Sequence, residues 1–308
     1  MRYEHLLARV ANELWAIDAS KLHEMLAVLA FRAAGHEFSA DEIKARIGDG
    51  KPVGRSPSGA VAVVPIRGVI AHRMSAMEES SGGTSAEGVA RMLRAVMADE
   101  QVGSIVLDID SPGGTVTGVS ELAGEIFGMR GQGKPIIAQV NGMAASAAYW
   151  LASQADEIHS IPSGLTGSIG VFTAHEDLSK ALAKEGIDVT LISAGKYKVE
   201  GNPFEPLSDE AKAFIQGRVD EAYATFVKDV ARGRGVGVAD VRNGFGQGRA
   251  LSAKDAKAAG LIDGIRTMDD TIGKLVGKKP AAGMRAESEE LDSDVRFDDD
   301  RARRLRLL

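Results

Sequence analysis

The chain of 308 residues contains no cysteine, which excludes disulfide bonds, thiol nucleophiles and cysteine-ligated zinc. An excess of basic residues is also lacking: 37 Lys and Arg stand against 43 Asp and Glu, giving a net charge of −6. Because a nucleic-acid-binding protein normally carries a basic surface, that class is disfavoured. Five of the six histidines are scattered along the chain without the spacing of metal ligands, so no metal site is predicted.

Long hydrophobic runs are absent as well. The longest stretch without a charged residue, 135–155, contains Gln139, Asn141 and Gln154 and is too polar for a membrane span. The N-terminus mixes charged residues with leucines instead of placing an apolar run behind a basic start, so no signal peptide is predicted. We therefore expect a soluble, cytoplasmic protein.

What is present is an alternation of strand-like and helix-like segments. Runs rich in Val and Ile predict strands at 60–70 (with a break at Pro65), 103–109, 135–140, 156–161, 167–173 and 187–193. Helical spacing predicts helices at 85–98, 116–129, 144–155, 176–185, 208–233 and 252–259, and one more ending near Val276. The segment 110–114 is predicted to be a tight turn. Such alternation is typical of an α/β fold with largely parallel strands.

Composition divides the chain into four segments. Leucines at helical spacing over about the first 35 residues predict a helical N-terminal segment, 1–47, and a turn-rich linker follows at 48–59. The α/β domain is predicted over 60–277, with a mobile polar loop at 72–84. An acidic cluster and then a basic one fill 278–308, which we expect to be disordered until bound.

One hydroxyl lies within a run of small residues. Residues 141–150 read NGMAASAAYW, and the strand predicted just before them leads Ser146 into the first turn of a helix. Unpaired backbone N–H groups favour developing negative charge there, as a serine nucleophile requires. The alternative is a serine that caps a buried helix made of small residues.

Two other segments bear on this chemistry. Gly113 and Gly114 follow a strand and leave backbone N–H groups unobstructed, as an oxyanion hole requires, although Pro-Gly-Gly is also a common structural turn. Residues 193–201 place Lys196 and Lys198 in a glycine-flanked loop after a predicted strand. A lysine in such a loop is ordinarily a solvated surface charge.

Together these segments resemble the signal peptide peptidase A (protease IV) family of serine–lysine peptidases, which includes the capsid assembly proteases of tailed bacteriophages. The resemblance covers roughly residues 60–265 and implies a Clp protease/crotonase-like spiral of ββα units. It is carried by five motifs in the family's order: DSPGG at 110–114, Ser146 before Tyr149 and Trp150, TGSIGV at 166–171, GKYK at 195–198, and residues 256–264.

The resemblance also implies a role for each site residue. Ser146 is the nucleophile, Lys198 the general base and Ser168 the residue that orients the base, while the N–H groups of Gly114 and Ala147 form the oxyanion hole. Lys196 is the rival base. Lys198 is preferred because in the family the base directly follows a Gly-x-aromatic triplet. Neither a metal nor an organic cofactor is implied.

A lysine base carries a physical requirement. A free lysine has a pKa near 10.4 and is a cation at neutral pH, so it cannot take the serine proton. Burial has to lower its pKa by about 3 units, which corresponds to roughly 4 kcal/mol. We expect Tyr197 and Tyr149 to supply that burial. Neutral Lys198 then activates Ser146, and an acyl-enzyme forms and is hydrolysed.

Three alternatives remain open at this stage. His175, with Glu176 or Asp177, is an alternative base for Ser146 in a Ser-His-Asp arrangement. A crotonase-like acyl-CoA enzyme shares the fold but needs neither a nucleophilic serine nor a buried lysine. A non-catalytic assembly protein is the third, although it has no reason to keep Ser146, Ser168 and Lys198 together.

The resemblance further implies the partners. They are polypeptide substrates, among them phage scaffold, capsid or portal proteins in the phage branch, or cleaved signal peptides in the cellular branch. A homo-oligomeric ring is expected, with helix 208–233 as part of its interface. The absence of a membrane anchor fits the phage branch, in which the site of action is the host cytoplasm or the prohead interior. The tail is expected to dock onto a partner or to be cut by the enzyme itself.

Overall fold

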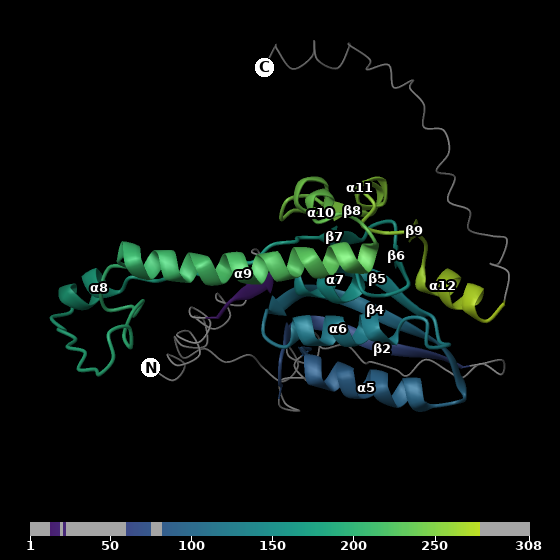
Figure 1. Ribbon diagram of the computed structural model, residues 1–308, viewed down its shortest axis with the longest axis horizontal. Coiled ribbons are helices and arrows are strands. Elements are labelled where there is room, and N and C mark those ends of the chain that lie inside the picture. Colours follow the sequence, from purple (N-terminus) through teal and green to yellow (C-terminus); the bar gives the residue numbers. More distant parts are fainter. Residues whose placement is uncertain (1–12, 19–20, 23–59, 75–81, 278–308) are drawn as a thin grey trace, which may run out of the picture. The chain divides into compact units, whose positions relative to one another are not determined.

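A computed structural model describes residues 13–18, 21–22, 60–74 and 82–277 (Figure 1). Their strands are β1 (Trp15–Ile17), β2 (Ala60–Ala71), β3 (Thr84–Ser85), β4 (Val102–Thr115), β5 (Ile136–Ala145), β6 (Glu157–Ser160), β7 (Leu165–Gly167), β8 (Ala250–Ser252) and β9 (Gly264–Ile265). Their helices are α5 (Ala86–Ala98), α6 (Val119–Met129), α7 (Ala147–Ala152), α8 (Ser179–Lys184), α9 (Asp209–Arg234), α10 (Val238–Gly244), α11 (Ala253–Ala258) and α12 (Met268–Leu275).

The strands form one sheet with hydrogen-bonded order β3-β2-β4-β5-β6-β9. Every pair along this path is parallel, whereas β1 joins β4 and β8 joins β7 in the antiparallel sense. A parallel sheet is covered on both faces, and four residues of β4 are accordingly fully buried: Ile105, Val106, Leu107 and Ile109. The predicted α/β class with largely parallel strands is confirmed, and it is consistent with a Clp protease-like fold.

Strand β4 is longer than the sequence indicates. The tight turn predicted at 110–114 is wrong, because these residues continue β4 as far as Thr115. They stay extended because both edges of the strand are paired. Gly114 pairs with Ile70 of β2 on one edge and with Ala16 of β1 on the other. The break predicted at Pro65 is also wrong, since the outer edge of β2 carries only the two-residue β3 and tolerates a proline.

Two further segments differ from expectation. The helix predicted over the first 35 residues is wrong at Trp15–Ile17, which form β1 and are almost fully buried, so strand pairing outweighs the helical spacing of the leucines. The strand predicted at 187–193 is also wrong, because these residues are exposed and pair with no strand among those described. Of the predicted N-terminal segment, only 13–18 and 21–22 are described. The linker at 48–59 and the tail at 278–308 lie outside the described residues.

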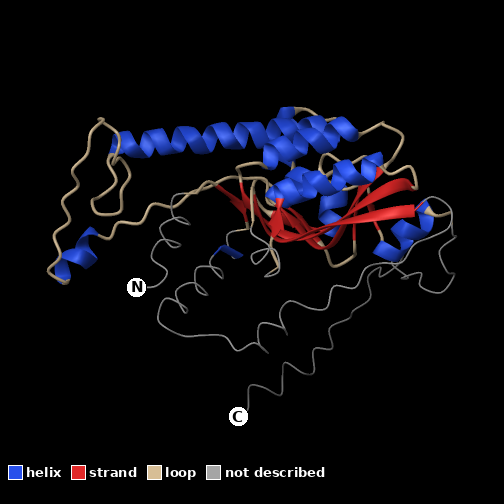
Figure 2. Ribbon diagram, turned by 90° about the horizontal axis from the view of Figure 1, so that it is seen from below, coloured by secondary structure: helices blue, strands red, loops and turns tan. Residues whose placement is uncertain are grey.

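Helix α9 is anchored at one end only. Near its C-terminal end the ring of Phe226 stacks on Trp150 of α7 with centroids 4.3 Å apart, and the Asp229 carboxylate accepts a hydrogen bond of 2.9 Å from Trp150 Nε1. The first half of α9 extends past the sheet and leads back to α8 (Figures 1 and 2). We call residues 177–214, which include α8 and the first turns of α9, the arm. No helix among the described residues is long and apolar enough to cross a membrane.

Candidate active site

Ser146 lies at the sharp junction between β5 and α7. It is the residue before the first helical position, not in the first turn as predicted, and its backbone has φ 56° and ψ −120°. Its N–H donates to the Gly167 carbonyl at 2.7 Å, and its own carbonyl accepts from Trp150 N at 2.9 Å. A non-glycine residue at positive φ costs on the order of 1–3 kcal/mol, and such strain is characteristic of functional turns between a strand and a helix.

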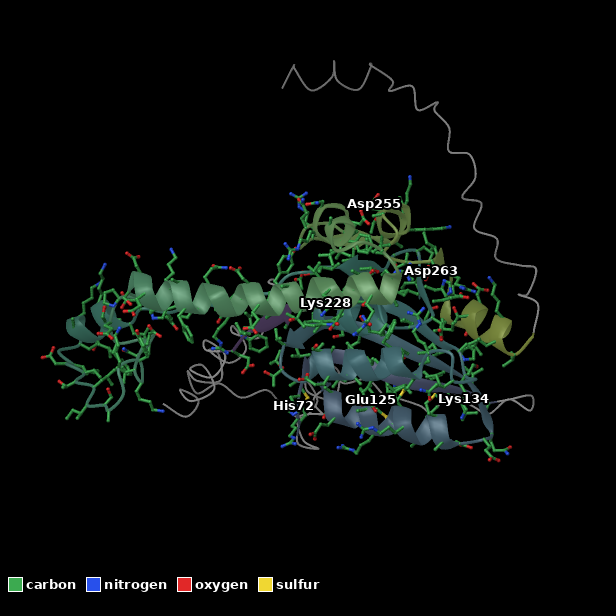
Figure 3. All side chains as sticks on the ribbon, in the orientation of Figure 1. His72, Glu125, Lys134, Lys228, Asp255 and Asp263 are labelled. Carbon is green, nitrogen blue, oxygen red and sulfur yellow. The ribbon has the colours of Figure 1, made fainter. Side chains whose placement is uncertain are left out.

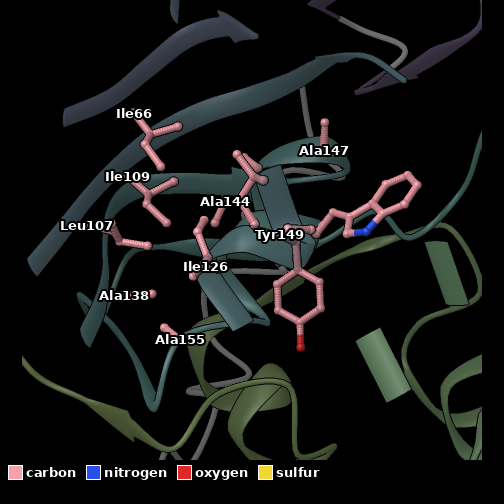
Figure 4. Close-up of a cluster of buried hydrophobic side chains, with 14 of the residues drawn as sticks. Ile66, Leu107, Ile109, Ile126, Ala138, Ala144, Ala147, Tyr149 and Ala155 are labelled. Atoms are coloured by element: carbon pink, nitrogen blue, oxygen red, sulfur yellow. The ribbon is translucent and has the colours of Figure 1, made fainter. Parts of the chain in front are cut away.

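The helix behind Ser146 is fixed in the core. All six residues of α7 are fully buried, and Ala144, Ala147 and Tyr149 lie among the aliphatic side chains of the sheet and α6 (Figure 4). The Tyr149 hydroxyl donates to the Leu261 carbonyl at 2.9 Å, and burial raises the pKa of Tyr149 above its usual value. Tyr149 therefore holds the helix in place and is not a neighbour of Lys198, contrary to the prediction.

The glycines of β4 pass directly beside this turn. A Cβ atom on Gly113 would lie 3.0 Å from the Ser146 Cβ and 2.9 Å from the Ala145 carbonyl oxygen, and Gly113 has φ 100°. A Cβ on Gly114 would overlap the Ile70 carbonyl oxygen at 1.8 Å. Only glycine therefore lets β4 approach Ser146 this closely. The structure brings together Ser146, its neighbour Ala147 and the glycine pair, as expected for an oxyanion hole.

Ser168 directly follows β7, which pairs with the strand that ends just before Ser146. Gly167 of β7 pairs with Ala145 of β5, so the two serines each follow one member of a paired position. Neighbouring strands are about 4.8 Å apart, which places the two backbones side by side. Ser168 also has positive φ (54°), is nearly buried, and donates its N–H to the Arg249 carbonyl at 2.9 Å. The Ser146 hydroxyl donates weakly to the Gly170 carbonyl, at 3.4 Å.

Lys198 is not near Ser146 within this chain. It is exposed and lies on the arm, in the segment between α8 and α9, whose side chains stand clear of the sheet (Figure 3). From the contact of Phe226 with Trp150 back to Asp209, α9 extends about 25 Å at 1.5 Å per residue. Tyr197, the other predicted neighbour of Lys198, is itself 52% exposed. The burial that a lysine base requires is therefore not supplied within one chain.

The two rival bases, Lys196 and His175, each have hydrogen-bond partners of their own. The Lys196 amine donates to the Tyr197 hydroxyl at 2.6 Å and to Glu210 at 3.2 Å, and these hydrogen bonds raise the pKa of Lys196, which opposes a role as base. His175 Nε2 bonds the Asn202 carbonyl at 3.1 Å. Asp177 accepts from the hydroxyl and N–H of Ser179, which lowers the pKa of Asp177. In the described residues, no hydrogen bond joins His175 to Ser146 or to an acid.

A cavity of about 560 Å³ lies between Leu14 and residues 171–175 on one side and, on the other, residues of the arm and α9 between Tyr197 and Val219. Its lining includes Leu14, Phe172, His175, Ile215 and Arg218. Sequence reasoning missed this cavity, and it also missed the nearby strand β1, because the Trp-Ala-Ile run that forms β1 was assigned to a helix. The available signal was three successive apolar residues, which no single helix face explains.

Comparison with known proteins places these residues in context. Residues 129–280 match the model of peptidase family S49. The chain is 38% identical over 212 residues to the head-tail preconnector protein GP5 of Enterobacteria phage P21, and 35% identical over 212 residues to capsid assembly protease C of Escherichia phage lambda. It is also 31% identical over 216 residues to protease 4 of Salmonella typhi.

These matches cover 69%, 69% and 70% of this chain but 42%, 48% and 34% of the respective relatives. The chain thus spans less than half the length of each of these three proteins. The family resemblance predicted from the motifs is confirmed.

Proposed function

Because the chain contains a peptidase family S49 domain, we propose that it is a serine peptidase in which Ser146 attacks the carbonyl of a peptide bond. The observation that carries this proposal is the strained turn that holds Ser146 against the glycine pair of β4. A strained, buried serine held against a glycine pair is the geometry that acyl transfer requires. An acyl-CoA enzyme of the same fold has no use for such a serine.

The oxyanion hole follows from the same geometry. In the proposal, the N–H groups of Gly114 and Ala147 donate to the oxygen that becomes negative when Ser146 attacks. Because α7 has only six residues, its dipole contributes little, and the two N–H groups act as direct donors. In the proposal, Ser168 accepts a hydrogen bond from the base and orients it, a role that its position next to the turn supports.

The base in this proposal is Lys198 of a neighbouring copy. Within one chain, Ser146 is buried in the sheet domain and Lys198 is exposed on the arm, so the site is incomplete. An arm that docks onto a second copy would bring Lys198 to that copy's Ser146. The same contact would bury the amine and disfavour its charged form, as a general base requires.

The surface of the arm supports such docking. Isolated exposed apolar residues are ordinary, but a concentration of them marks an interaction site. Seven large apolar or aromatic side chains are exposed within the 28 residues from Ile187 to Phe214: Ile187, Val189, Leu191, Ile192, Tyr197, Phe204 and Phe214. Ile192 is 95% exposed. Repeating one contact between a protruding arm and the next copy's sheet domain builds a ring when the rotation closes, in agreement with the predicted homo-oligomer.

The substrates proposed are polypeptides, and phage head proteins rank first. This ranking rests on the capsid assembly protease of phage lambda and the preconnector protein of phage P21 among the relatives. The site of action would then be the host cytoplasm or the prohead interior. The alternative is degradation of cleaved signal peptides, which the match to protease 4 supports.

Peptidase activity is tested by digestion of a peptide library, read by mass spectrometry. Wild-type protein is expected to cleave the library, and Ser146→Ala and Lys198→Ala are expected to lose activity by about a thousandfold or more. Lys196→Ala and His175→Ala serve as matched controls and should stay within about threefold of wild type. An inactive His175→Ala beside an active Lys198→Ala would refute the proposed base.

The substrate class is tested separately. Wild-type protein is incubated with a phage scaffold protein and a major capsid protein, and in parallel with a panel of signal peptides. Discrete cuts in the head proteins, absent with Ser146→Ala, would support head maturation. Cleavage of the signal peptides alone would favour the alternative.

A further inference from the structure

Strand β1 occupies the space next to Ser146 on the edge of β4. Along that edge, β4 pairs with β5 as far as Ser111, and from Gly113 onward it pairs with β1 instead. The change of partner occurs where β5 turns sharply at Ser146. A segment lying at this position passes the nucleophile and the glycine pair together, which is the position that a substrate must take.

The chain is held there on both sides, as an extended peptide is held between two strands. On the β4 side, Asp18 N donates to the Pro112 carbonyl at 2.8 Å and Val116 N donates to the Leu14 carbonyl at 3.1 Å. On the other side, Trp15 N and Phe172 O lie 2.8 Å apart, and Phe172 N and Trp15 O lie 3.0 Å apart. This arrangement is antiparallel strand addition, the mode by which many proteins bind extended peptides.

The register places one carbonyl at the reacting position. Along an antiparallel ladder, hydrogen-bonded pairs alternate with pairs that are not hydrogen-bonded. Leu14 bonds Val116 and Asp18 bonds Pro112, so the pair midway between them, Ala16 and Gly114, is also a hydrogen-bonded pair. The Ala16 carbonyl oxygen and the Ser146 Cβ lie 2.2 Å and 3.0 Å from one and the same point, the position of a Cβ on Gly113. The Ala16 carbonyl therefore lies on the proposed oxyanion amide and beside the nucleophile.

The side chains fit the same interpretation. Ala16 is completely buried in the main core, where its methyl group is the only side chain of β1, while Trp15 and Ile17 point the other way and pack with Leu22, Val69 and Phe172. Leu14, two residues before Ala16 and therefore on the same face of the strand as Ala16, borders the 560 Å³ cavity. When an extended peptide binds as an added strand, pockets that accept its alternate side chains give specificity. A small residue at the reacting position and a larger one beside a cavity fit this pattern.

We propose that β1 is an internal substrate and that the chain cuts itself between Ala16 and Ile17; this inference rests on the proposed function. The Ser146 oxygen attacks the Ala16 carbonyl carbon and gives its proton to the base. The bond from the Ala16 carbonyl carbon to the Ile17 nitrogen breaks, and that nitrogen takes the proton and leaves as an amine. Water then hydrolyses the Ala16 ester, which restores the Ser146 hydroxyl and releases a carboxylate at Ala16. Cutting opens the groove for other polypeptides.

The test follows the N-terminus of the full-length protein by intact-mass spectrometry during incubation. Three samples are compared: wild type alone, Ser146→Ala alone, and an equimolar mixture of the two. In the mixture, Ser146→Ala carries a mass tag at its C-terminus. Wild type is expected to yield a product that begins at Ile17. Ser146→Ala is expected to stay intact, alone and in the mixture, because its β1 pairs with its own glycine strand and not with that of another copy.

Each outcome decides one of the two proposals, because the same samples are also given the peptide library. Cleavage of the library by wild type whose N-terminus stays intact would overturn the internal-substrate proposal and leave the peptidase standing. Cutting of the tagged Ser146→Ala chain at Ala16 in the mixture would show that β1 is cut by the serine of another copy, and would overturn the proposal that each chain cuts its own β1. If neither the library nor β1 is cut, both proposals fail. A delay in library digestion that matches the time course of cutting at Ala16 would support the proposal that β1 closes the groove.

Discussion

Ser146 combines two properties that are rarely found together in a residue kept only for packing. It is 1% exposed, yet its backbone has a conformation that is essentially reserved for glycine. A helix cap needs no such strain, since Ser85, Ser208 and Ser252 cap their helices from the ordinary extended region. The difference separates Ser146 from the capping serine that the sequence alone left open.

This strain predicts an order of stability among inactive variants. Ser146→Gly and Ser146→Ala both remove the hydroxyl, but only glycine adopts φ 56° and ψ −120° without steric cost. Ser146→Gly is therefore expected to be more stable than Ser146→Ala by about 1–2 kcal/mol, even though alanine is ordinarily the more favourable residue. Denaturant unfolding of the two variants measures the difference, and an alanine variant that equals or exceeds the glycine variant would contradict the strain.

The sequence was informative at the residue scale because the chemistry leaves a local pattern. A hydroxyl within a run of small residues and a glycine pair after a strand are visible without a fold. The approach of Gly113 to Ser146 was not visible, because it depends on the pairing of strands that are about 30 residues apart in sequence. The positive φ of Ser146 and Ser168 has no signature in sequence either, since serine ordinarily avoids that region.

Helices and strands were predictable wherever the segment's own pattern of apolar residues and caps determines its structure. Helix α9 was located to within one residue at each end, because Ser208 caps it and apolar residues recur at helical spacing. The segments 110–114 and 15–17 were misassigned, because in both cases strand pairing outweighs local preference. The strand expected at 187–193 is missing for the opposite reason, since its apolar residues have no partner strand among the described residues and stay exposed.

Helix α9 has two structural roles: one half packs on α7 and the other half leads to the arm. Its C-terminal half closes over α7, with Asp229 accepting from Trp150 Nε1 at 2.9 Å and from the Ser120 hydroxyl at 3.1 Å. Its N-terminal half carries the arm. A rigid helix fixed at one end therefore sets where the arm lies relative to the Ser146 turn. Disturbing the anchored half should affect both stability and activity.

Two glycines of α9 give a matched test of that anchor. A Cβ on Gly233 would lie 2.1 Å from the Ser153 carbonyl oxygen, whereas a Cβ on Gly217 would meet nothing within 4 Å. Gly233→Ala is expected to destabilise the protein by about 2 kcal/mol or more, because a backbone atom has to move. Gly217→Ala is expected to be stabilising by about 0.5–1 kcal/mol through helix propensity. Thermal unfolding midpoints measure both, and a neutral Gly233→Ala would show that the close packing of α9 on α7 does not contribute to stability.

At the scale of the whole molecule, a single chain does not complete the proposed site. Lys198 was assigned as the base by resemblance, and no feature of the sequence states which copy's serine it serves. The exposed arm and the buried serine supply the missing argument, because a general base has to be desolvated and the arm offers no burial of its own. Assembly would then be a condition for activity.

Mixing two inactive variants tests this arrangement directly. Ser146→Ala keeps the lysine and Lys198→Ala keeps the serine, so a site shared between copies is restored wherever a Lys198→Ala chain receives the arm of a Ser146→Ala chain. In a randomly mixed head-to-tail ring about a quarter of the sites are of this kind, so about a quarter of wild-type activity is expected after the two proteins are unfolded and refolded together. The control is each variant refolded alone, which should stay inactive. A mixture that also stays inactive, while refolded wild type is active, would place serine and lysine in the same chain and require the arm to fold back onto its own sheet domain.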